Sequence, residues 1–196
     1  MFTGIIGTLG RFQRYGRGQA ELIVEAPGAA GRSEIGGSVA VDGVCLSVVR
    51  QDGSNLVFNL SGETRARTTL GLLRPGAVLN LEWPLTLAAP LNGHLVSGHV
   101  DYVATVKRVV PKRPGRRLVL SLPAEFRPFF VVKGSAAVNG VSLTVAALGP
   151  SAFEVELIPV TLETSNLAAL RAGAAVNVEC DMFGKYVYNW ASQRSR

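Results

Sequence analysis

The chain of 196 residues has only two cysteines, only two histidines and no long apolar segment. Cys45 and Cys180 form neither a disulfide framework nor the ligand spacing of a zinc site. No apolar run approaches the roughly 18–20 residues that a membrane span requires. The opening MFTGIIGTLG lacks the basic segment and cleavage site of a signal peptide. We therefore expect a cytoplasmic protein that does not span a membrane and holds no metal.

Acidic residues are also in the minority, with 14 Asp and Glu against 20 Lys and Arg, which gives a net charge of +6. A basic chain suggests a nucleic-acid partner, but this charge does not form a recognised binding motif. Its densest cluster, at residues 107–117, contains two prolines and a glycine, which indicates a solvated hairpin tip or loop. Exposed aromatic platforms for single strands are missing as well. A nucleic-acid-binding barrel is therefore only a minor alternative, and we expect no nucleic acid partner.

What the sequence does contain is an internal repeat. Displaced by 97 positions, residues 37–82 align with residues 134–179 without a gap, and 18 of the 46 positions are identical. GSVAVDGVCLSV falls on GSAAVNGVSLTV, and LLRPGAVLNLE falls on ALRAGAAVNVE. A chain of this length accommodates two domains of roughly 90–100 residues. The repeat therefore predicts two copies of one module.

Turn signals and alternation predict that each module is a small antiparallel β-barrel. Asp42-Gly43 and Asn139-Gly140 suit the positive φ angles of a tight type I′ hairpin, and strands are expected at 44–49 and 141–146. Residues 79–83 and 176–180 alternate between apolar and polar, which indicates half-buried strands and makes Cys180 a buried, inert thiol. Helical turns are expected near 65–73 and 123–130, and the join between domains near 87–101.

The segment after the second copy carries one helical stripe of apolar residues. Its members recur at intervals of three and four: Phe183, Tyr186, Val187, Trp190 and Ala191. The stripe either packs on its own domain or contacts another subunit.

The strand after each tight turn places small polar side chains opposite an aliphatic stripe. Cys45 and Ser47 share one face in the first copy, and Ser142 and Thr144 share the matching face in the second. A single row of this kind is an ordinary surface, but its repetition favours a pair of related ligand-binding shelves. We name these the N shelf and the C shelf.

The two copies differ in the residues that can react. Only the first has a thiol on its shelf, and both histidines, His94 and His99, lie between the copies in GHLVSGHVD. His99 and Asp101 share a face of an extended segment, so Asp101 is expected to orient the imidazole. These differences predict two similar pockets, of which one carries the reactive groups and the other chiefly binds the ligand.

Six motifs together resemble the riboflavin synthase family: MFTGII, VDGVCLSV, GHLVSGHVD, KGSAAVNGVSLTV, IPVTLETSNL and VNVECD. The resemblance covers essentially the whole chain. It implies an all-β fold of two six-stranded Greek-key barrels with a C-terminal helix, in a homotrimer. The implied boundaries are 1–90 and 98–181 for the barrels, 91–97 for a linker and 182–196 for the helix.

The family converts two molecules of 6,7-dimethyl-8-ribityllumazine into riboflavin and a ribitylamino-pyrimidinedione, and it needs no cofactor or metal. Each of its sites joins the N barrel of one subunit to the C barrel of a neighbour. Carried onto this chain, the implied N-barrel half of the site contains Phe2, Thr3, Gly4, Cys45, Ser47, Gly62, Thr64, His94 and His99. The implied C-barrel half contains Lys133, Ser142, Thr144, Ile158, Thr161 and Asp181.

The chain departs from the family pattern at a few positions. Ser47 replaces a threonine and keeps the hydroxyl, Val160 replaces a polar residue beside Thr161, and Ser61-Gly62 replaces a bulkier pair. The thiol and both histidines are retained. They favour the enzyme over the main alternative, a non-catalytic lumazine- or flavin-binding fluorescent accessory protein.

The resemblance implies a catalytic group of His99, Cys45 and His94. His99 is the first candidate for the base that deprotonates the lumazine C7 methyl group, and His94 is the second. Cys45 either adds covalently to the second lumazine or positions it. An association with lumazine synthase, which produces the substrate, is left open.

Overall fold

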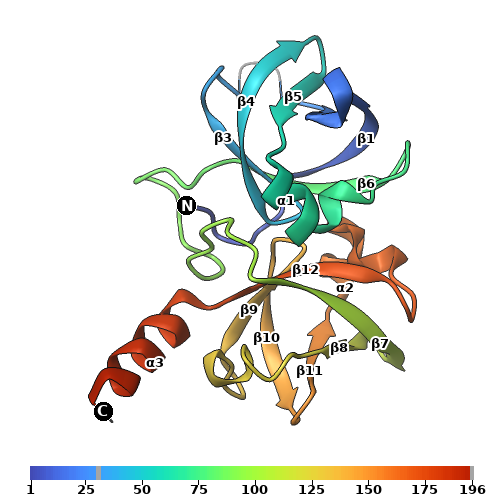
Figure 1. The fold of residues 1–196 in the computed structure, drawn as a ribbon. Helices are drawn as coiled ribbons and strands as arrows, with labels where there is room; N and C mark the ends of the chain where they lie inside the picture. The colour runs from blue at the N-terminus through green and yellow to red at the C-terminus, as the bar shows by residue number, and fades with distance from the viewer. Residues whose placement is uncertain (30–31, 195–196) are drawn as a thin grey trace.

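The computed structural model describes residues 1–29 and 32–194 of the chain. Two closed six-stranded barrels lie one against the other, and a helix at the C-terminus projects away from them (Figure 1). The N barrel contains β1 (Thr8–Gly16), β2 (Glu21–Glu25), β3 (Ser38–Val41), β4 (Val44–Asp52), β5 (Asn55–Asn59) and β6 (Val78–Glu82). The C barrel contains β7 (Tyr102–Lys112), β8 (Gly115–Ser121), β9 (Ser135–Val138), β10 (Val141–Leu148), β11 (Ala152–Leu157) and β12 (Ala175–Cys180).

The two barrels have one topology. Their cyclic strand orders are β1-β2-β5-β4-β3-β6 and β10-β11-β8-β7-β12-β9. Each strand of the N barrel has as its counterpart the strand whose number is higher by six, so that β1 corresponds to β7 and β4 to β10. Three hairpin-connected strands and a fourth that returns beside the first of them make a Greek key. All pairs are antiparallel, and the register shifts after Val48 in β4 and after the equivalent Val145 in β10. Such bulges bend a strand, which helps a small sheet to close. The predicted fold class is confirmed.

Both predicted tight hairpins are present. Asp42 and Gly43 have φ angles of 45° and 77°, and Asn139 and Gly140 have 44° and 78°. Two consecutive positive φ angles define the type I′ turn, whose twist matches that of the strands it joins. The turns fix which side chains of β4 and β10 face the barrel interiors, because successive residues of a strand point to opposite faces. Val44, Leu46 and Val48 are buried accordingly.

Each barrel has its own apolar core. The N-barrel core is built around Phe12, Phe58 and several leucines, and the C-barrel core around Phe153, Leu118 and Leu120, all of them nearly inaccessible to solvent. Cys180 belongs to the C-barrel core, and burial raises the pKa of its thiol. The prediction that this thiol is buried is confirmed.

Short helical segments follow the fifth strand of each barrel. They are α1 (Gly62–Arg67) and η2 (Thr69–Gly71) in the N barrel, and α2 (Pro159–Thr164) and η4 (Asn166–Ala169) in the C barrel. The hydroxyl of Ser61 caps α1 by accepting a hydrogen bond from Thr64 N at 3.0 Å, whereas α2 begins with a proline, which suits the first helical position. The remaining segments are η1 (Arg17–Gln19) and η3 (Arg127–Phe129).

The prediction that β6 and β12 are half-buried is wrong, because their polar residues are buried as well. Asn80 and Asn177 are each 1% exposed, since the other barrel covers their side of the strand. The side chain of Asn80 donates to the carbonyl of Asn139 at 2.9 Å, and that of Asn177 donates to the carbonyl of Asp42 at 2.9 Å. These reciprocal bonds satisfy polar groups that would otherwise be costly to bury.

One member of this interface is a carboxyl group. Asp42 Oδ1 accepts hydrogen bonds from Asn80 N and from Asn166 Nδ2, both at 2.8 Å. Burial raises the pKa of Asp42 from 3.8 to about 7. The equivalent residue in the C barrel is Asn139, which accepts the same backbone bond from Asn177 at 2.8 Å. The interface is therefore symmetric in geometry but not in charge.

The last helix, α3 (Met182–Arg194), has no buried residue. The predicted apolar stripe lies on it and is exposed: Phe183 by 63%, Tyr186 by 70%, Val187 by 64% and Trp190 by 58%. Within the described residues, no helix combines the length and the apolar character that crossing a bilayer requires. The basic cluster lies on the hairpin of β7 and β8, as predicted, where Lys112 and Arg117 pair with Glu156.

Candidate functional site

Two extended segments, one at the N-terminus and one at the linker, run side by side between the barrels (Figure 1). Phe2 and Val96 form an antiparallel bridge, with hydrogen bonds of 2.7 and 3.1 Å between their backbones. Together with Ala40 and Ala137 they make a small apolar cluster against which Cys45 packs. The predicted site residues Phe2, Thr3 and Gly4 are thus buried between the barrels.

Each segment continues onto the shelf of the opposite barrel. The carbonyl of Gly4, near the start of the chain, accepts a hydrogen bond from Ser142 N of the C shelf at 2.8 Å. The carbonyl of Gly98 accepts one from Cys45 N of the N shelf, also at 2.8 Å. Both glycines have positive φ, and a Cβ on either would lie within 2.6 Å of the Cβ of the facing shelf residue. Only glycine permits this approach.

The C shelf lines a pocket of about 300 Å³ at the surface of the C barrel. Five of the predicted site residues meet there: Lys133, Ser142, Thr144, Ile158 and Thr161. Three hydroxyls and an ammonium group therefore converge on one cavity, beside the apolar side chains of Leu143 and Ala146. A cavity with an apolar wall and a few convergent polar groups suits a small polar heterocycle with hydroxylated substituents.

His94 belongs to the C shelf, although the family resemblance implied the N-barrel half. Its Nδ1 lies 2.7 Å from Ser142 Oγ, because the N-terminal part of the linker passes over β10. Burial lowers the pKa of His94, and the nearby Asp181 carboxylate opposes this in part. In the tautomer that leaves Nδ1 unprotonated, the imidazole accepts the Ser142 proton and increases the nucleophilicity of its oxygen.

The N shelf has the same pattern of exposure as the C shelf. Cys45 is half-buried and Ser47 is exposed on the same face of β4, and Gly62 and Thr64 lie on α1 after the neighbouring strand β5. His99 directly follows Gly98, whose carbonyl contacts Cys45, and it is exposed. The linker therefore contacts both shelves: Gly98, the residue before His99, binds the backbone of Cys45, and the imidazole of His94 lies at the hydroxyl of Ser142.

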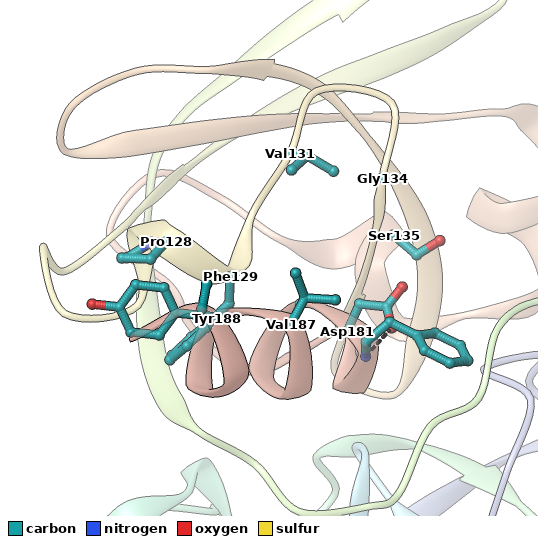
Figure 2. Close-up of a pocket in the computed structure, with 11 residues that line it drawn as sticks. Pro128, Phe129, Val131, Gly134, Ser135, Asp181, Val187 and Tyr188 are labelled. Atoms are coloured by element: carbon teal, nitrogen blue, oxygen red, sulfur yellow. Dashed lines mark hydrogen bonds between the residues drawn. The ribbon is translucent and has the colours of Figure 1, made fainter. Parts of the chain in front are cut away.

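Asp181 does not line the pocket of the C shelf. It lines a separate groove of about 410 Å³ between α3 and the C barrel, together with Phe129, Val131 and Val187 (Figure 2). Its Oδ1 accepts a hydrogen bond from Phe183 N at 3.0 Å, at the start of α3. Asp181 therefore affects the predicted site only through its charge, which raises the pKa of His94.

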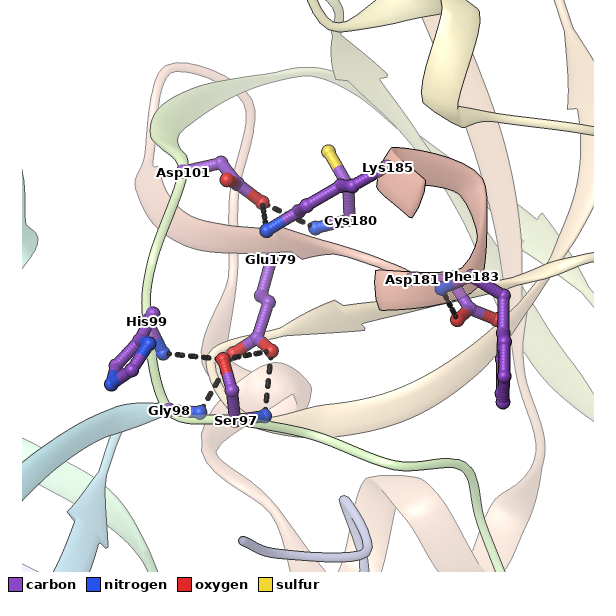
Figure 3. Close-up of polar contacts among 9 residues, drawn as sticks. All are labelled: Ser97, Gly98, His99, Asp101, Glu179, Cys180, Asp181, Phe183 and Lys185. Atoms are coloured by element: carbon purple, nitrogen blue, oxygen red, sulfur yellow. Dashed lines mark hydrogen bonds and ion pairs between the residues drawn. The ribbon is translucent and has the colours of Figure 1, made fainter. Parts of the chain in front are cut away.

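The prediction that Asp101 orients His99 is wrong. Asp101 Oδ2 accepts hydrogen bonds from Cys180 N and from Lys185 Nζ, both at 2.7 Å, which ties α3 to the C barrel (Figure 3). Alternation along the chain does not show that β12 and α3 offer Asp101 these two partners. Asp101 is therefore a structural residue of the C barrel.

The sequence predictions missed three acidic residues. Glu156 lines the C-shelf pocket, where Lys112 and Arg117 contact it and lower the pKa of its carboxyl group. Glu82 and Glu179 are buried between the barrels, 6% and 3% exposed. The sequence contained a signal for Glu82 and Glu179, because both copies of the repeat have glutamate at this position. The alternation of apolar and polar residues, however, predicted that both side chains face solvent. Within residues 1–29 and 32–194, no group of three or more His, Cys, Asp or Glu side chains is arranged to hold a metal.

Comparison with known families identifies the class of the protein. The model of the lumazine binding domain matches the chain twice, at residues 3–83 and 97–181. The chain therefore belongs to the lumazine-binding domain family, and the two matches correspond to its two barrels.

Individual relatives narrow this class and confirm the resemblance. Riboflavin synthase of Mycobacterium tuberculosis is 39% identical over 196 residues, which cover 95% of this chain and 96% of that protein. Riboflavin synthase of Bacillus subtilis is 34% identical, over 97% of this chain and 89% of that protein. Among solved structures, LumP complexed with riboflavin superimposes with a TM-score of 0.85 at 23% identity, covering 92% of this chain and 99% of that one. This last likeness confirms the fold.

Proposed function

We propose that this chain is a riboflavin synthase. It transfers a four-carbon unit between two molecules of 6,7-dimethyl-8-ribityllumazine, giving riboflavin and 5-amino-6-ribitylamino-pyrimidinedione. The observation that carries the proposal is the pair of equivalent shelves, together with a linker that brings His94 to the C shelf and His99 next to the residue that contacts the N shelf. A dismutation consumes two copies of one substrate, so two copies of one pocket suit it. The full-length relatives named riboflavin synthase support the same reaction.

His99 is the proposed base on the N shelf. The C7 methyl group of the lumazine is acidic because its carbanion delocalises into the ring system, and an imidazole suits a proton transfer near neutral pH. Cys45 and Ser47 lie on the same shelf, and Thr64 follows on α1. We propose that these three residues position the ring and the ribityl chain of the lumazine that loses this proton.

The C-shelf pocket is the proposed place of the second lumazine. Ser142, polarised by the neutral His94 at 2.7 Å, attacks the ring or directs a water molecule to it. Thr144, Thr161 and Lys133 supply hydrogen bonds to the ring edge and the ribityl hydroxyls. The polar groups of the pocket fix orientation, and its apolar wall supplies affinity.

A complete site needs both shelves, and we propose that it forms between subunits of a homotrimer. The exposed stripe of α3 supports an interface between copies of this chain, because a lone protomer rarely exposes so many large apolar side chains together. Holding two lumazines face to face converts a bimolecular step into an effectively unimolecular one. This is worth up to about 7–11 kcal/mol when the geometry is good.

The remaining parts of the proposal concern organisation. We assign residues 1–90 and 98–181 to two lumazine-binding domains, 91–97 to their linker and 182–196 to oligomerisation. We also propose a cytoplasmic enzyme, which suits the free thiols of Cys45 and Cys180. Association with lumazine synthase belongs to the same proposal and is tested by co-elution of the two proteins.

The direct test is to incubate the purified chain with 6,7-dimethyl-8-ribityllumazine and to follow riboflavin fluorescence. We expect one riboflavin for every two lumazines consumed, and two lumazine analogues bound per complete site. A tightly bound chromophore without product would favour the non-catalytic accessory protein instead. Salt-dependent binding of an oligonucleotide in place of the lumazine would favour a nucleic-acid binder.

A further inference from the structure

Glu179 lies on β12 of the C barrel, yet its carboxylate holds the turn that carries His99. Its Oε1 accepts hydrogen bonds from the backbone N and the hydroxyl of Ser97, both at 2.7 Å, and its Oε2 accepts one from Gly98 N at 2.9 Å (Figure 3). Because Glu179 is buried, solvent does not compete for these hydrogen bonds.

The same turn connects this carboxylate to the backbone of His99 and of Cys45. The hydroxyl of Ser97, held by Glu179, accepts a hydrogen bond from His99 N at 3.2 Å. The carbonyl of Gly98 accepts one from Cys45 N at 2.8 Å. A change at Glu179 therefore shifts the backbone on which the imidazole is mounted and its contact with the strand of the thiol.

The first repeat contains the same arrangement without a histidine. Glu82 accepts bonds from the N and the hydroxyl of Thr3, both at 2.7 Å, and from Gly4 N at 3.0 Å. The hydroxyl of Thr3 accepts a bond from Ile5 N at 3.1 Å. Ile5 thus stands where His99 stands in the second repeat. Glu82 is therefore a matched control for Glu179: both hold an equivalent turn, but only the turn held by Glu179 carries His99.

We propose that Glu179 is a positioning residue of the reaction, which fixes His99 against the N shelf from the opposite barrel. The inference rests on the proposed function, since it concerns how the candidate base of that reaction is held. Small displacements of a reacting group reduce rates by large factors, so the effect falls on turnover more than on affinity. Glu82 holds the equivalent turn, which carries Ile5 in place of His99. Because the Thr3 carbonyl of that turn accepts a hydrogen bond from His94 N at 3.1 Å, Glu82 is a control for His99 and not for His94.

The test is a double-mutant cycle with Glu179→Gln and His99→Gln, repeated with Glu82→Gln in place of Glu179→Gln. We expect Glu179→Gln to lower kcat by roughly tenfold to a hundredfold when His99 is present, to move the pH profile of kcat, and to have little further effect in the His99→Gln background. Glu82→Gln is expected to act by the same factor in both backgrounds, because its turn carries Ile5 and does not contact His99. Equal, additive losses for the two glutamates would overturn the proposal.

Two further measurements keep the result decisive. If Glu179→Gln does not fold, Ser97→Ala removes the hydroxyl that accepts His99 N, and Thr3→Ala removes its counterpart at Ile5. The cycle is also measured on the affinity for 6,7-dimethyl-8-ribityllumazine and on the NMR titration of the His99 imidazole. If the wild-type chain binds lumazine but forms no riboflavin, the proposed function fails, whereas coupling of Glu179 to His99 in these two readouts still decides the positioning role.

Discussion

The N shelf and the C shelf are built on the same scaffold but carry different chemistry. Both follow a type I′ turn, both precede a bulge at the same register, and both contact a glycine of a crossing segment at 2.8 Å. What differs is a few side chains: a thiol against a hydroxyl at Cys45 and Ser142, and an imidazole against an alkyl group at His99 and Ile5. The comparison shows that backbone geometry persisted after duplication while function diverged at single positions.

Substitutions at His99 and at the equivalent Ile5 are expected to give the largest difference between the two shelves. His99→Gln is expected to lower the rate of riboflavin formation by about 10²–10⁴-fold, the usual contribution of a general base. Ile5→Gln changes the equivalent position and is expected to have a much smaller effect. Steady-state kinetics followed by riboflavin fluorescence measures both. Comparable losses in the two variants would show that the position matters for packing rather than for proton transfer.

The pair Cys45 and Ser142 tests which shelf supplies a nucleophile. Cys45→Ser keeps a hydrogen-bonding group in place, so we expect about tenfold loss or less in single-turnover rate. Ser142→Ala leaves His94 without its partner and is expected to cost more. A loss on the order of 10⁶-fold for Cys45→Ser, as for removal of a covalent nucleophile, would reverse the assignment.

The pair Asp42 and Asn139 tests the interface between the barrels. The pKa of Asp42 is raised to about 7 in the folded state from 3.8, so the folded state binds the proton more tightly than the unfolded one. Stability therefore falls as the pH rises from about 4 to 7, and the loss is fully present above pH 7. Asp42→Asn keeps the Oδ1 acceptor and removes this loss, so it is expected to stabilise the protein at pH 8 by up to about 4 kcal/mol.

Urea unfolding at pH 5 and pH 8 measures this effect. The reverse substitution, Asn139→Asp, places a second carboxyl group in the equivalent buried turn and is expected to destabilise at pH 8 more than at pH 5. An Asp42→Asn variant whose stability equals that of the wild type at both pH values would show that Asp42 is solvated in the folded protein.

The smallest expected effect is on substrate affinity, and it comes from substituting Glu156, whose counterpart in the N barrel is Asn59. Lys112 and Arg117 lower the pKa of Glu156, so the carboxylate stays ionised at neutral pH, and we expect it to accept hydrogen bonds from ribityl hydroxyls in the C-shelf pocket. Glu156→Gln is expected to raise the KM for lumazine by about 2- to 10-fold with kcat nearly unchanged, the scale of one hydrogen bond. Asn59→Gln is the matched change in the N barrel. A larger effect on kcat than on KM would contradict a role in binding.

The sequence predicted the barrels well because their signals are local. Tight turns at Asp42-Gly43 and Asn139-Gly140 and the alternation after them depend on neighbouring residues only, and a fixed offset of 97 residues extends each observation to the other copy. The same alternation failed at Asn80 and Glu82, because whether a polar face is solvated depends on what packs against it.

The site was predicted less completely, for a related reason. The C-shelf residues Ser142, Thr144 and Thr161 meet because they share one module. The placement of His94 on the C shelf depends on Thr3 and Ser142, and the binding of Asp101 depends on Cys180 and Lys185. These partners are far apart in the sequence, and periodicity contains no information about them.

The reciprocal crossing of the two segments has a consequence for the origin of the protein. Gly4 on Ser142 and Gly98 on Cys45 are the contacts that two identical modules would exchange across a two-fold axis, each patch serving on both sides. An ancestor of half this length would thus have been an isologous pair, in which every substitution altered both halves at once. Tandem fusion removed that constraint, and a histidine could then arise opposite one shelf while isoleucine stayed opposite the other.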